Sequence, residues 1–236
     1  MPTTPRARAR AQTMEDIVRI GREHLATDGA AALSLRAVAR DLGVVSSAVY
    51  RYVRSRDELL TLLVVDGYNA LGDAVDAALE AAPDDPTEQL RVLGRAVLGW
   101  ARAEPARYGL LFGTPVPGYD APAEQTTAPG TRVIVAMQTL FARAYARGLL
   151  TPPDPLPRVS GALAASFAAI RDEFALDVPD WLLARGVTVW PALFGAVTFD
   201  VFDQYGPDTF ADRDELFELQ LDGFLDMLGF RRRSGT

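Results

Sequence analysis

The residues best suited to chemistry in this 236-residue chain lie in one short stretch, Ser46-Ser47-Ala48 followed by Tyr50-Arg51-Tyr52. Small side chains on the first turn of a helix let its backbone and hydroxyl groups approach base edges in the DNA major groove. Bulkier donors behind them can reach phosphates. The stretch therefore predicts base contacts by the three small residues and phosphate contacts by the two tyrosines and Arg51.

The preceding sequence predicts the elements that would hold this stretch in place. Ser34 is a suitable cap for the first of two short helices. Apolar residues then recur on one face of a 3.6-residue period, at Leu35, Val38, Ala39 and Leu42. Gly43 would end that helix, because glycine adopts a left-handed backbone at little cost. With Val49 and Val53 facing inward, the pattern favours a DNA-reading helix-turn-helix, the alternative being a helical hairpin in an ordinary bundle.

A third helix is predicted directly after this pair. Ser55-Arg56-Asp57-Glu58 has the S-x-x-E spacing of a capping box, which marks the start of a helix. The free N–H groups of that helix end, together with Arg56, would face an anion. We expect the anion to be a DNA phosphate.

These motifs together resemble the N-terminal domain of the TetR family of transcriptional regulators. The resemblance covers residues 13–60: a first helix ending in Asp28-Gly29, then L-S-L-x-x-V-A-x-x-L-G-V, A-V-Y-R-Y-V and S-R-D-E-L-L. Further on, Ala103–Phe112 and Trp190–Gly195 resemble the ligand-binding domains named for a W-H-G signature, with Phe194 where that subclass usually has histidine.

The resemblance implies roles for the matched positions. Ser34 and Arg36 would touch the DNA backbone or the groove edge, and Arg56 stands where the family commonly has a phosphate-binding lysine. Val45 replaces a serine that often caps the recognition helix, which leaves Ser46 as the alternative cap. The predicted DNA-binding residues are Ser34, Arg36, Ser46, Ser47, Ala48, Tyr50, Arg51, Tyr52 and Arg56.

The distribution of charge agrees with a DNA-binding N-terminal region. The whole chain has a net charge of −7, yet residues 1–56 hold ten arginines against five acids, and the remainder is strongly acidic. A positive end on a negative body orients a protein toward DNA. We expect a flexible basic arm at 1–12, a DNA-binding domain at 13–60 and a ligand-binding and dimerisation domain at 61–236. The arm would lie in a minor groove or form a disordered tail.

Composition excludes several classes of protein. The sequence has no run of eighteen apolar residues and no secretory leader pattern, so we expect a cytoplasmic protein without membrane contact. It has no cysteine and one histidine, His24, and no spacing typical of a metal site, a phosphate loop or a catalytic serine. We therefore expect neither an enzyme nor a bound metal or cofactor.

Helical periodicity continues to the end of the chain, so an all-α fold is predicted. A long helix would run from the capping box to Pro83 and join the two domains. Proline-rich loops are expected at 114–130, as a lid or a mobile segment, and at 151–157. The other predicted helices are 85–104, 131–147, 158–176, 181–205 and 212–228.

The last two helices, 181–205 and 212–228, carry more apolar residues than one buried face of a monomer requires. A two-fold dimer would cover the excess, and a helix-turn-helix usually needs a dimer to span two half-sites on DNA. TetR-like proteins typically pair these helices as a four-helix bundle. The alternative is a buried monomer core.

The resemblance also places an inducer cavity among the middle helices. Binding sites are mostly apolar with a few polar anchors, and Gln138, Tyr145, Arg171 or Thr188 could supply these anchors. An aromatic residue at helical spacing can equally belong to the core. The candidate lining residues are Trp100, Tyr108, Leu111, Phe112, Met137, Phe141, Phe167, Ile170, Phe174 and Trp190.

The combined prediction is a homodimeric regulator, a repressor that binds a palindromic double-stranded operator. A largely apolar small molecule would lower its DNA affinity by favouring another spacing of the two DNA-reading domains. The alternative function is a helical small-molecule-binding or interaction module without operator binding.

Overall fold

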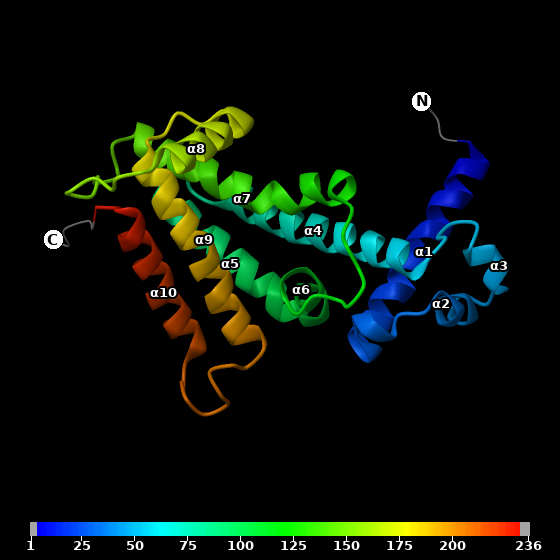
Figure 1. Ribbon diagram of the computed structural model, residues 1–236. Helices are drawn as coiled ribbons and strands as arrows, with labels where there is room; N and C mark the ends of the chain where they lie inside the picture. The colour runs from blue at the N-terminus through cyan, green and yellow to red at the C-terminus, as the bar shows by residue number, and fades with distance from the viewer. Residues whose placement is uncertain (1–3, 232–236) are drawn as a thin grey trace. The chain divides into compact units, whose positions relative to one another are not determined.

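The computed structural model describes residues 4–231, which fold into helices joined by loops (Figure 1). No strand forms within these residues, where Leu150 and Phe230 make an isolated β-bridge. The predicted all-α fold is confirmed. The helices are α1 (Pro5–Asp28), α2 (Leu35–Asp41), α3 (Ser46–Val49), α4 (Arg56–Ala81), α5 (Pro86–Ala103), α6 (Pro105–Phe112), α7 (Ala123–Ala146), α8 (Gly161–Phe174), α9 (Asp180–Val201) and α10 (Arg213–Leu228), with a 3₁₀ turn at Ala30–Ala32.

The chain forms two compact units. The first contains the residues up to Leu71 together with Ala103–Gly130, and the second contains Gly72–Arg102 and the residues from Thr131 onward. Helices α4 and α7 each contribute to both. The expected functional boundary after residue 60 stays a prediction.

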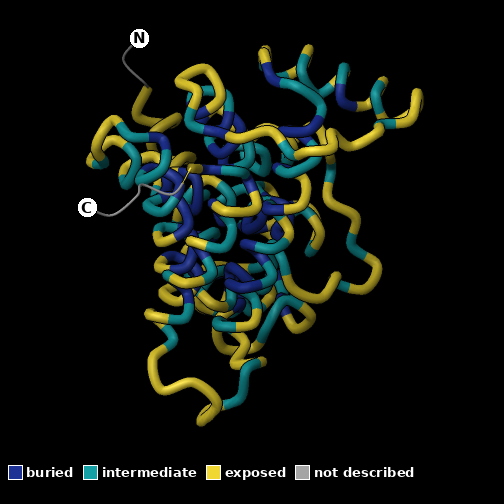
Figure 2. The backbone as a smooth tube through the Cα atoms, turned by 90° about the vertical axis from the view of Figure 1, so that its left-hand side faces the viewer, coloured by how far each residue is buried: buried dark blue, intermediate teal, exposed yellow. Residues whose placement is uncertain are grey.

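The first unit is built around one apolar core. Its buried members come from α1, α2, α3 and α4 and from two connecting segments, which contribute Leu33 and Val53. Figure 2 colours each described residue of the chain by its burial. Leu110 of α6 and two residues of the following loop, Val116 and Tyr119, pack on the same core. The Tyr119 and Thr61 hydroxyls are 3.1 Å apart, so part of the expected lid loop lies on the helix-turn-helix core. The core is formed by Ile17, Ile20, Leu33, Leu35, Val38, Ala39, Val49, Val53, Leu59, Leu60 and Leu63.

Helix starts follow their capping residues. The Glu58 amide donates to the Ser55 hydroxyl at 3.1 Å, and the Glu58 carboxylate accepts from the Arg54 amide at 2.6 Å. The predicted capping box is therefore present, although its carboxylate bonds to the amide before the cap. Asp85 caps α5 through the Thr87 amide, and Asp212 caps α10 through the Glu215 amide.

Two helix starts differ from the sequence prediction. The first helix begins at Pro5, so residues 5–12 are helical rather than a flexible arm; residues 1–3 of that predicted arm lie outside the described residues. Thr4 accepts a bond from the Ala7 amide, and Pro5 suits the first helical position. Helix α7 begins at Ala123 and continues through Pro129, so the predicted loop of 114–130 ends eight residues early.

In the second unit, α9 and α10 pack side by side (Figure 1). Helix α5 approaches α10 where Gly94 faces Leu221, and a side-chain carbon at Gly94 would collide with that leucine. Glycine at position 94 therefore leaves room for the Leu221 side chain between the two helices. The predicted helices 181–205 and 212–228 are confirmed, the first of them ending four residues early, at Val201.

Candidate nucleic-acid interface and ligand cavity

A tight turn joins α2 to α3. Gly43 has φ 72°, the left-handed conformation that favours glycine. Its amide donates to the Arg40 carbonyl at 3.0 Å, and the Val44 amide donates to the Ala39 carbonyl at 3.0 Å. These bonds satisfy the last carbonyls of α2 and fix the direction in which α3 begins.

Helix α3 is one turn long and is held by its inner face. Val49 and Val53 are buried in the core of the first unit, as predicted. Val45 stands at the N-cap, where no side chain accepts a bond from the helix amides. Ser46 is therefore the first helical residue, and the alternative in which it caps the helix is wrong.

The predicted base-reading and groove-edge residues lie on or beside the outer face of this motif. Arg36 and Ser47 are exposed, whereas Ser34, Ser46 and Ala48 are half-buried. Ser34 occupies the N-cap of α2 as predicted, but its hydroxyl does not bond to the helix amides. The DNA-contacting roles of these five residues stay predictions.

Three arginines around α3 have no carboxylate partner within residues 4–231: Arg36, Arg51 and Arg54. All three are exposed, and Tyr50 beside them is exposed as well. Guanidinium groups of this kind are free to bind phosphate oxygens. The sequence interpretation missed Arg54, although its position just before a capping box could have indicated it.

Tyr52 is more constrained than its neighbours. Its ring packs partly against the core of the first unit, and the Arg10 guanidinium of α1 lies 5.1 Å from the ring centroid. This distance suits a cation–π contact. Residues 5–12 were predicted to be a flexible arm. Because they are instead the first turns of α1, Arg10 is held beside Tyr52, which follows α3.

Arg56 is also engaged within the protein. Its guanidinium donates to the Ala30 and Ala31 carbonyls at 2.9 and 3.3 Å, and its side chain is about one-third exposed. It lies 3.8 Å from Asp57. Arg56 thus links the start of α4 to the 3₁₀ turn. To bind a phosphate as predicted, its guanidinium would have to donate to the phosphate as well as to these carbonyls, or break its bonds to them.

His24 joins α1 to the end of α2. Its Nε2 lies 2.6 Å from Asp41 Oδ2, and Asp41 also accepts a bond from Arg40. The hydrogen bond from Arg40 first, and that from His24 second, lower the pKa of Asp41 to about 2. The pair therefore helps hold two helices of the motif together. Residues 4–231 contain no cluster of three or more potential metal ligands.

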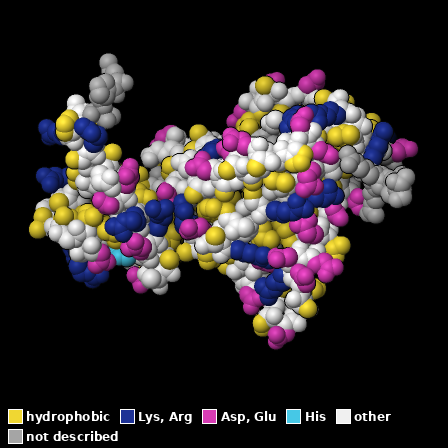
Figure 3. All heavy atoms as spheres, turned by 180° about the vertical axis from the view of Figure 1, so that it is seen from behind, with side chains coloured by type: hydrophobic (Ala, Val, Ile, Leu, Met, Phe, Trp, Pro, Cys, Tyr) yellow, Lys and Arg dark blue, Asp and Glu magenta, His cyan; other side chains and the backbone are white. Residues whose placement is uncertain are grey.

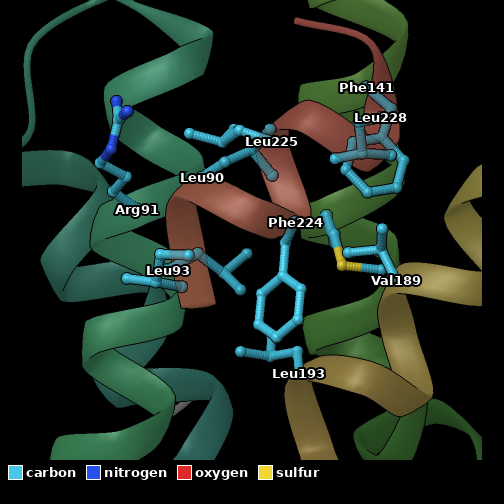
Figure 4. Close-up of a pocket in the computed structure, with 11 residues that line it drawn as sticks. Leu90, Arg91, Leu93, Phe141, Val189, Leu193, Phe224, Leu225 and Leu228 are labelled. Carbon is cyan, nitrogen blue, oxygen red and sulfur yellow. The ribbon is translucent and has the colours of Figure 1, made fainter. Parts of the chain in front are cut away.

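The second unit contains a small apolar cavity. Its volume is about 20 Å³, which is room for about one water molecule and far below the hundreds of Å³ of a typical ligand site. Side chains from α5, α7, α9 and α10 fill the surrounding space (Figure 4). The lining residues are Leu90, Arg91, Leu93, Met137, Phe141, Val189, Leu193, Leu221, Phe224, Leu225 and Leu228.

The structure does not bring the ten predicted lining residues around one cavity. Met137 and Phe141 line the small cavity, whereas Tyr108, Leu111 and Phe112 belong to α6 in the first unit. The Phe112 ring centroid is 6.0 Å from that of Tyr68 and 5.1 Å from that of Tyr108. The other predicted residues pack elsewhere in the second unit: Trp100 and Phe167 are buried, and Ile170, Phe174 and Trp190 are half-buried.

The proposed polar anchors have other contacts. Arg171 donates to Asp180 at 2.6 Å, the Thr188 hydroxyl donates to the Ala184 carbonyl, and the Tyr145 ring lies 6.1 Å from that of Trp181. Gln138 is buried.

A second, larger hollow of about 1060 Å³ opens to solvent between the start of α5 and α10. Its lining contains both carboxylates and apolar side chains.

Comparison with known proteins identifies the architecture. Residues 17–63 match the model of bacterial regulatory proteins of the tetR family, and residues 90–224 match the tetracyclin repressor-like C-terminal domain. The first match contains the whole helix-turn-helix, and the second contains all the residues that line the small cavity except Leu225 and Leu228. The finer resemblance to the W-H-G subclass stays a prediction.

Curated relatives and solved structures agree. The chain is 44% identical to the HTH-type transcriptional regulators Rv1816 of Mycobacterium tuberculosis and Mb1846 of Mycobacterium bovis, over 90% of each chain. The crystal structure of SCO4313 superposes on this chain with a TM-score of 0.73. The two sequences are 34% identical, and the match covers 94% of this chain and 100% of that one. The TetR family regulator PfmR of Thermus thermophilus shares the fold at 19% identity and a TM-score of 0.57, over 92% and 99% of the two chains. This chain therefore belongs to the TetR family and is a DNA-binding transcriptional regulator, not an enzyme.

Proposed function

We propose that the protein is a repressor that binds a palindromic operator as a homodimer, with α3 of each subunit in the major groove. One observation carries the proposal: three exposed arginines without carboxylate partners surround a helix whose outer residues are small. Ser46, Ser47 and Ala48 would approach bases. The flanking donors would bind phosphates and set the register of the helix in the groove.

Dimerisation would use α9 and α10, within the predicted segments 181–205 and 212–228. Exposed apolar side chains on and next to these helices support this: Val187, Phe199, Phe202, Leu219 and Met227. Several exposed large apolar side chains on two neighbouring helices are typical of an interaction site, and a two-fold axis would cover them with the same surface of a second copy. The dimer would present two α3 helices to adjacent half-sites.

The regulating ligand would be a largely apolar small molecule that enters the small cavity of the second unit. The lining is apolar apart from Arg91, which supports that chemistry. Because the cavity has a volume of only about 20 Å³, the ligand would have to bind an expanded form. By binding that form more tightly it would shift the population toward it and lower DNA affinity.

We place the regulator in the cytoplasm, where its operator would be. Helix α9 has the length and hydropathy of a membrane span. Its inner residues, including Leu193 and Val197, are nevertheless buried within the second unit, as in a core helix of a soluble protein.

The test is fluorescence anisotropy on tiled duplexes from the DNA flanking the gene, at two salt concentrations with competitor DNA. We expect tight, competitor-resistant binding to one tile, with one or two dimers per site. The Arg51→Ala variant should weaken that binding, whereas Arg102→Ala in the second unit should not. Weak binding to every tile, abolished by salt, would contradict an operator in that region and favour the alternative of an interaction module.

A further inference from the structure

Val45 is the most exposed large hydrophobic side chain in the described part of the chain. Its exposed fraction is 72%, against 39% for the neighbouring Val44. It occupies the N-cap of α3 with an extended backbone, directly before Ser46. The side chain therefore projects from the surface that carries the predicted base-reading residues.

An apolar side chain at this position contributes nothing to the helix itself. The side chain of serine, threonine, aspartate or asparagine at an N-cap would accept a bond from an amide of the first turn, and the Val45 side chain has no atom able to do so; only its backbone carbonyl accepts, from the Ala48 amide at 2.8 Å. Its side chain is also not part of the core of the first unit. Neither capping nor packing explains a valine here.

The C5-methyl of thymine is the one methyl group on the base edges of the major groove, and the other groups that distinguish the bases there are hydrogen-bond donors and acceptors. We propose that Val45 reads a thymine methyl in each half-site and is a specificity-determining residue. The proposal rests on operator binding through α3. Ala48 is a weaker candidate for the same contact, because its side chain is one carbon and half-buried.

The test uses an operator selected from random duplexes by the full-length protein. Each thymine is then replaced by deoxyuridine, in both half-sites at once, which removes only the methyl group. For the wild type we expect one symmetric pair of replacements to raise the Kd about fifteenfold, or about fourfold per half-site, as burial of one methyl group predicts. Other replacements should change the Kd by less than about twofold.

Three variants test whether Val45 is the residue that distinguishes thymine from deoxyuridine. Val45→Ala should bind the thymine operator about as weakly as the wild type binds the deoxyuridine operator, and it should no longer distinguish the two. Val44→Ala is the matched control, because it makes the same change one residue away, and it should keep the discrimination. Val45→Ser should raise the melting temperature by restoring a cap while losing the discrimination.

The possible failures are distinguishable. If Val45→Ala still distinguishes thymine from deoxyuridine, or if Val44→Ala loses that discrimination, the assignment to Val45 is wrong. An operator in which no thymine replacement affects the wild type overturns the methyl contact but leaves operator binding intact. Failure to select any operator overturns both proposals.

Discussion

The arginines of the two units behave differently. In the second unit most of the described arginines pair with carboxylates, several of them on other helices, and arginine and acidic side chains alternate on its surface (Figure 3). Around α3 and at the start of α1, six exposed arginines have no carboxylate partner within the described residues: Arg6, Arg8, Arg10, Arg36, Arg51 and Arg54. The same side chain therefore links helices in one region and is left available in the other.

The difference in pairing indicates different roles for the paired and the unpaired arginines. A guanidinium bonded to a carboxylate has its charge satisfied and offers little to a phosphate, whereas an unpaired one keeps its field and its donors. The contrast depends on pairing and not only on location, because Arg107 lies in the first unit and is paired. Its side chain is 7% exposed, and it donates to the Asp66 carboxylate at 2.7 Å and to the Asp66 carbonyl at 3.0 Å.

Replacing Arg107 should have the largest effect. Arg107→Ala leaves the Asp66 carboxylate without its main partner, and we expect the free energy of unfolding to fall by about 3 kcal/mol. Urea denaturation measures this. Arg6→Ala is the control, since it removes an unpaired arginine of the same unit and should change stability by less than about 0.5 kcal/mol. Equal losses in the two variants would remove the distinction between paired and unpaired arginines.

Arg102 tests pairing in the second unit. It donates to both oxygens of Asp200, at 2.7 and 2.9 Å, and to Asp214 at 2.5 Å. The Asp200 side chain is only 8% exposed, so Arg102→Ala should lower the free energy of unfolding by about 1–2 kcal/mol. The salt dependence of DNA binding should not change. A reduced salt slope would mean that this arginine also contacts DNA.

Arg51→Ala should have the opposite profile. A homodimer would lose two phosphate contacts, so the slope of log K against log salt should become less negative by about 1.8. Stability should stay within about 0.5 kcal/mol, because no ion pair is lost. Titrations at four or more salt concentrations measure the slope, and an unchanged slope would contradict the phosphate contact.

Arg56 sharpens the comparison, because sequence and structure suggest different partners for it. If its bonds to the Ala30 and Ala31 carbonyls are its main contribution, Arg56→Ala should destabilise the protein by about 1 kcal/mol and leave the salt slope unchanged. A slope change of about 1.8 without destabilisation would instead support the phosphate contact. Urea denaturation and salt titration of one variant separate the two.

The smallest expected effect concerns Asp41. Its pKa in the folded state is lowered to about 2, below the value near 4 of an unfolded chain, by Arg40 and then by His24. A lowered pKa stabilises the fold above pH 4, and this contribution is lost as the pH falls toward 2. We expect Asp41→Asn to be less stable than the wild type at pH 6, with the gap closing between pH 4 and 2. Urea midpoints across this range measure it, and a constant gap would exclude this linkage.

Local rules predicted most of the helices. Asp85 with Pro86, Asp212, and Ser55 with Glu58 are short-range signals, and each helix starts where they indicate. The start of α7 was missed because Pro129 read as part of a loop, whereas the helix continues through it. A proline ring fixes a backbone angle that a helix also uses, so one missing amide does not always end a helix.

The ligand cavity was predicted less well, for a physical reason. Phe224 lines the cavity and Phe167 does not, yet both are aromatic residues at helical spacing. What separates them is packing between distant helices, such as the approach at Gly94 and Leu221. The pairing of Arg102 with Asp200 likewise joins residues nearly a hundred positions apart. Neither contact leaves a short-range pattern in the sequence.

The first turns of α1 should show fast amide hydrogen exchange. Helix α1 has no buried residue before Ile17, and short helical segments without packing are marginal in water. The amide protons of Ala7 to Ala11 should therefore exchange with solvent through local opening, far faster than those of the core. When DNA is bound, contacts by Arg6, Arg8 or Arg10 would slow that exchange. The beginning of the chain would then report occupancy of the operator as a change in exchange rate.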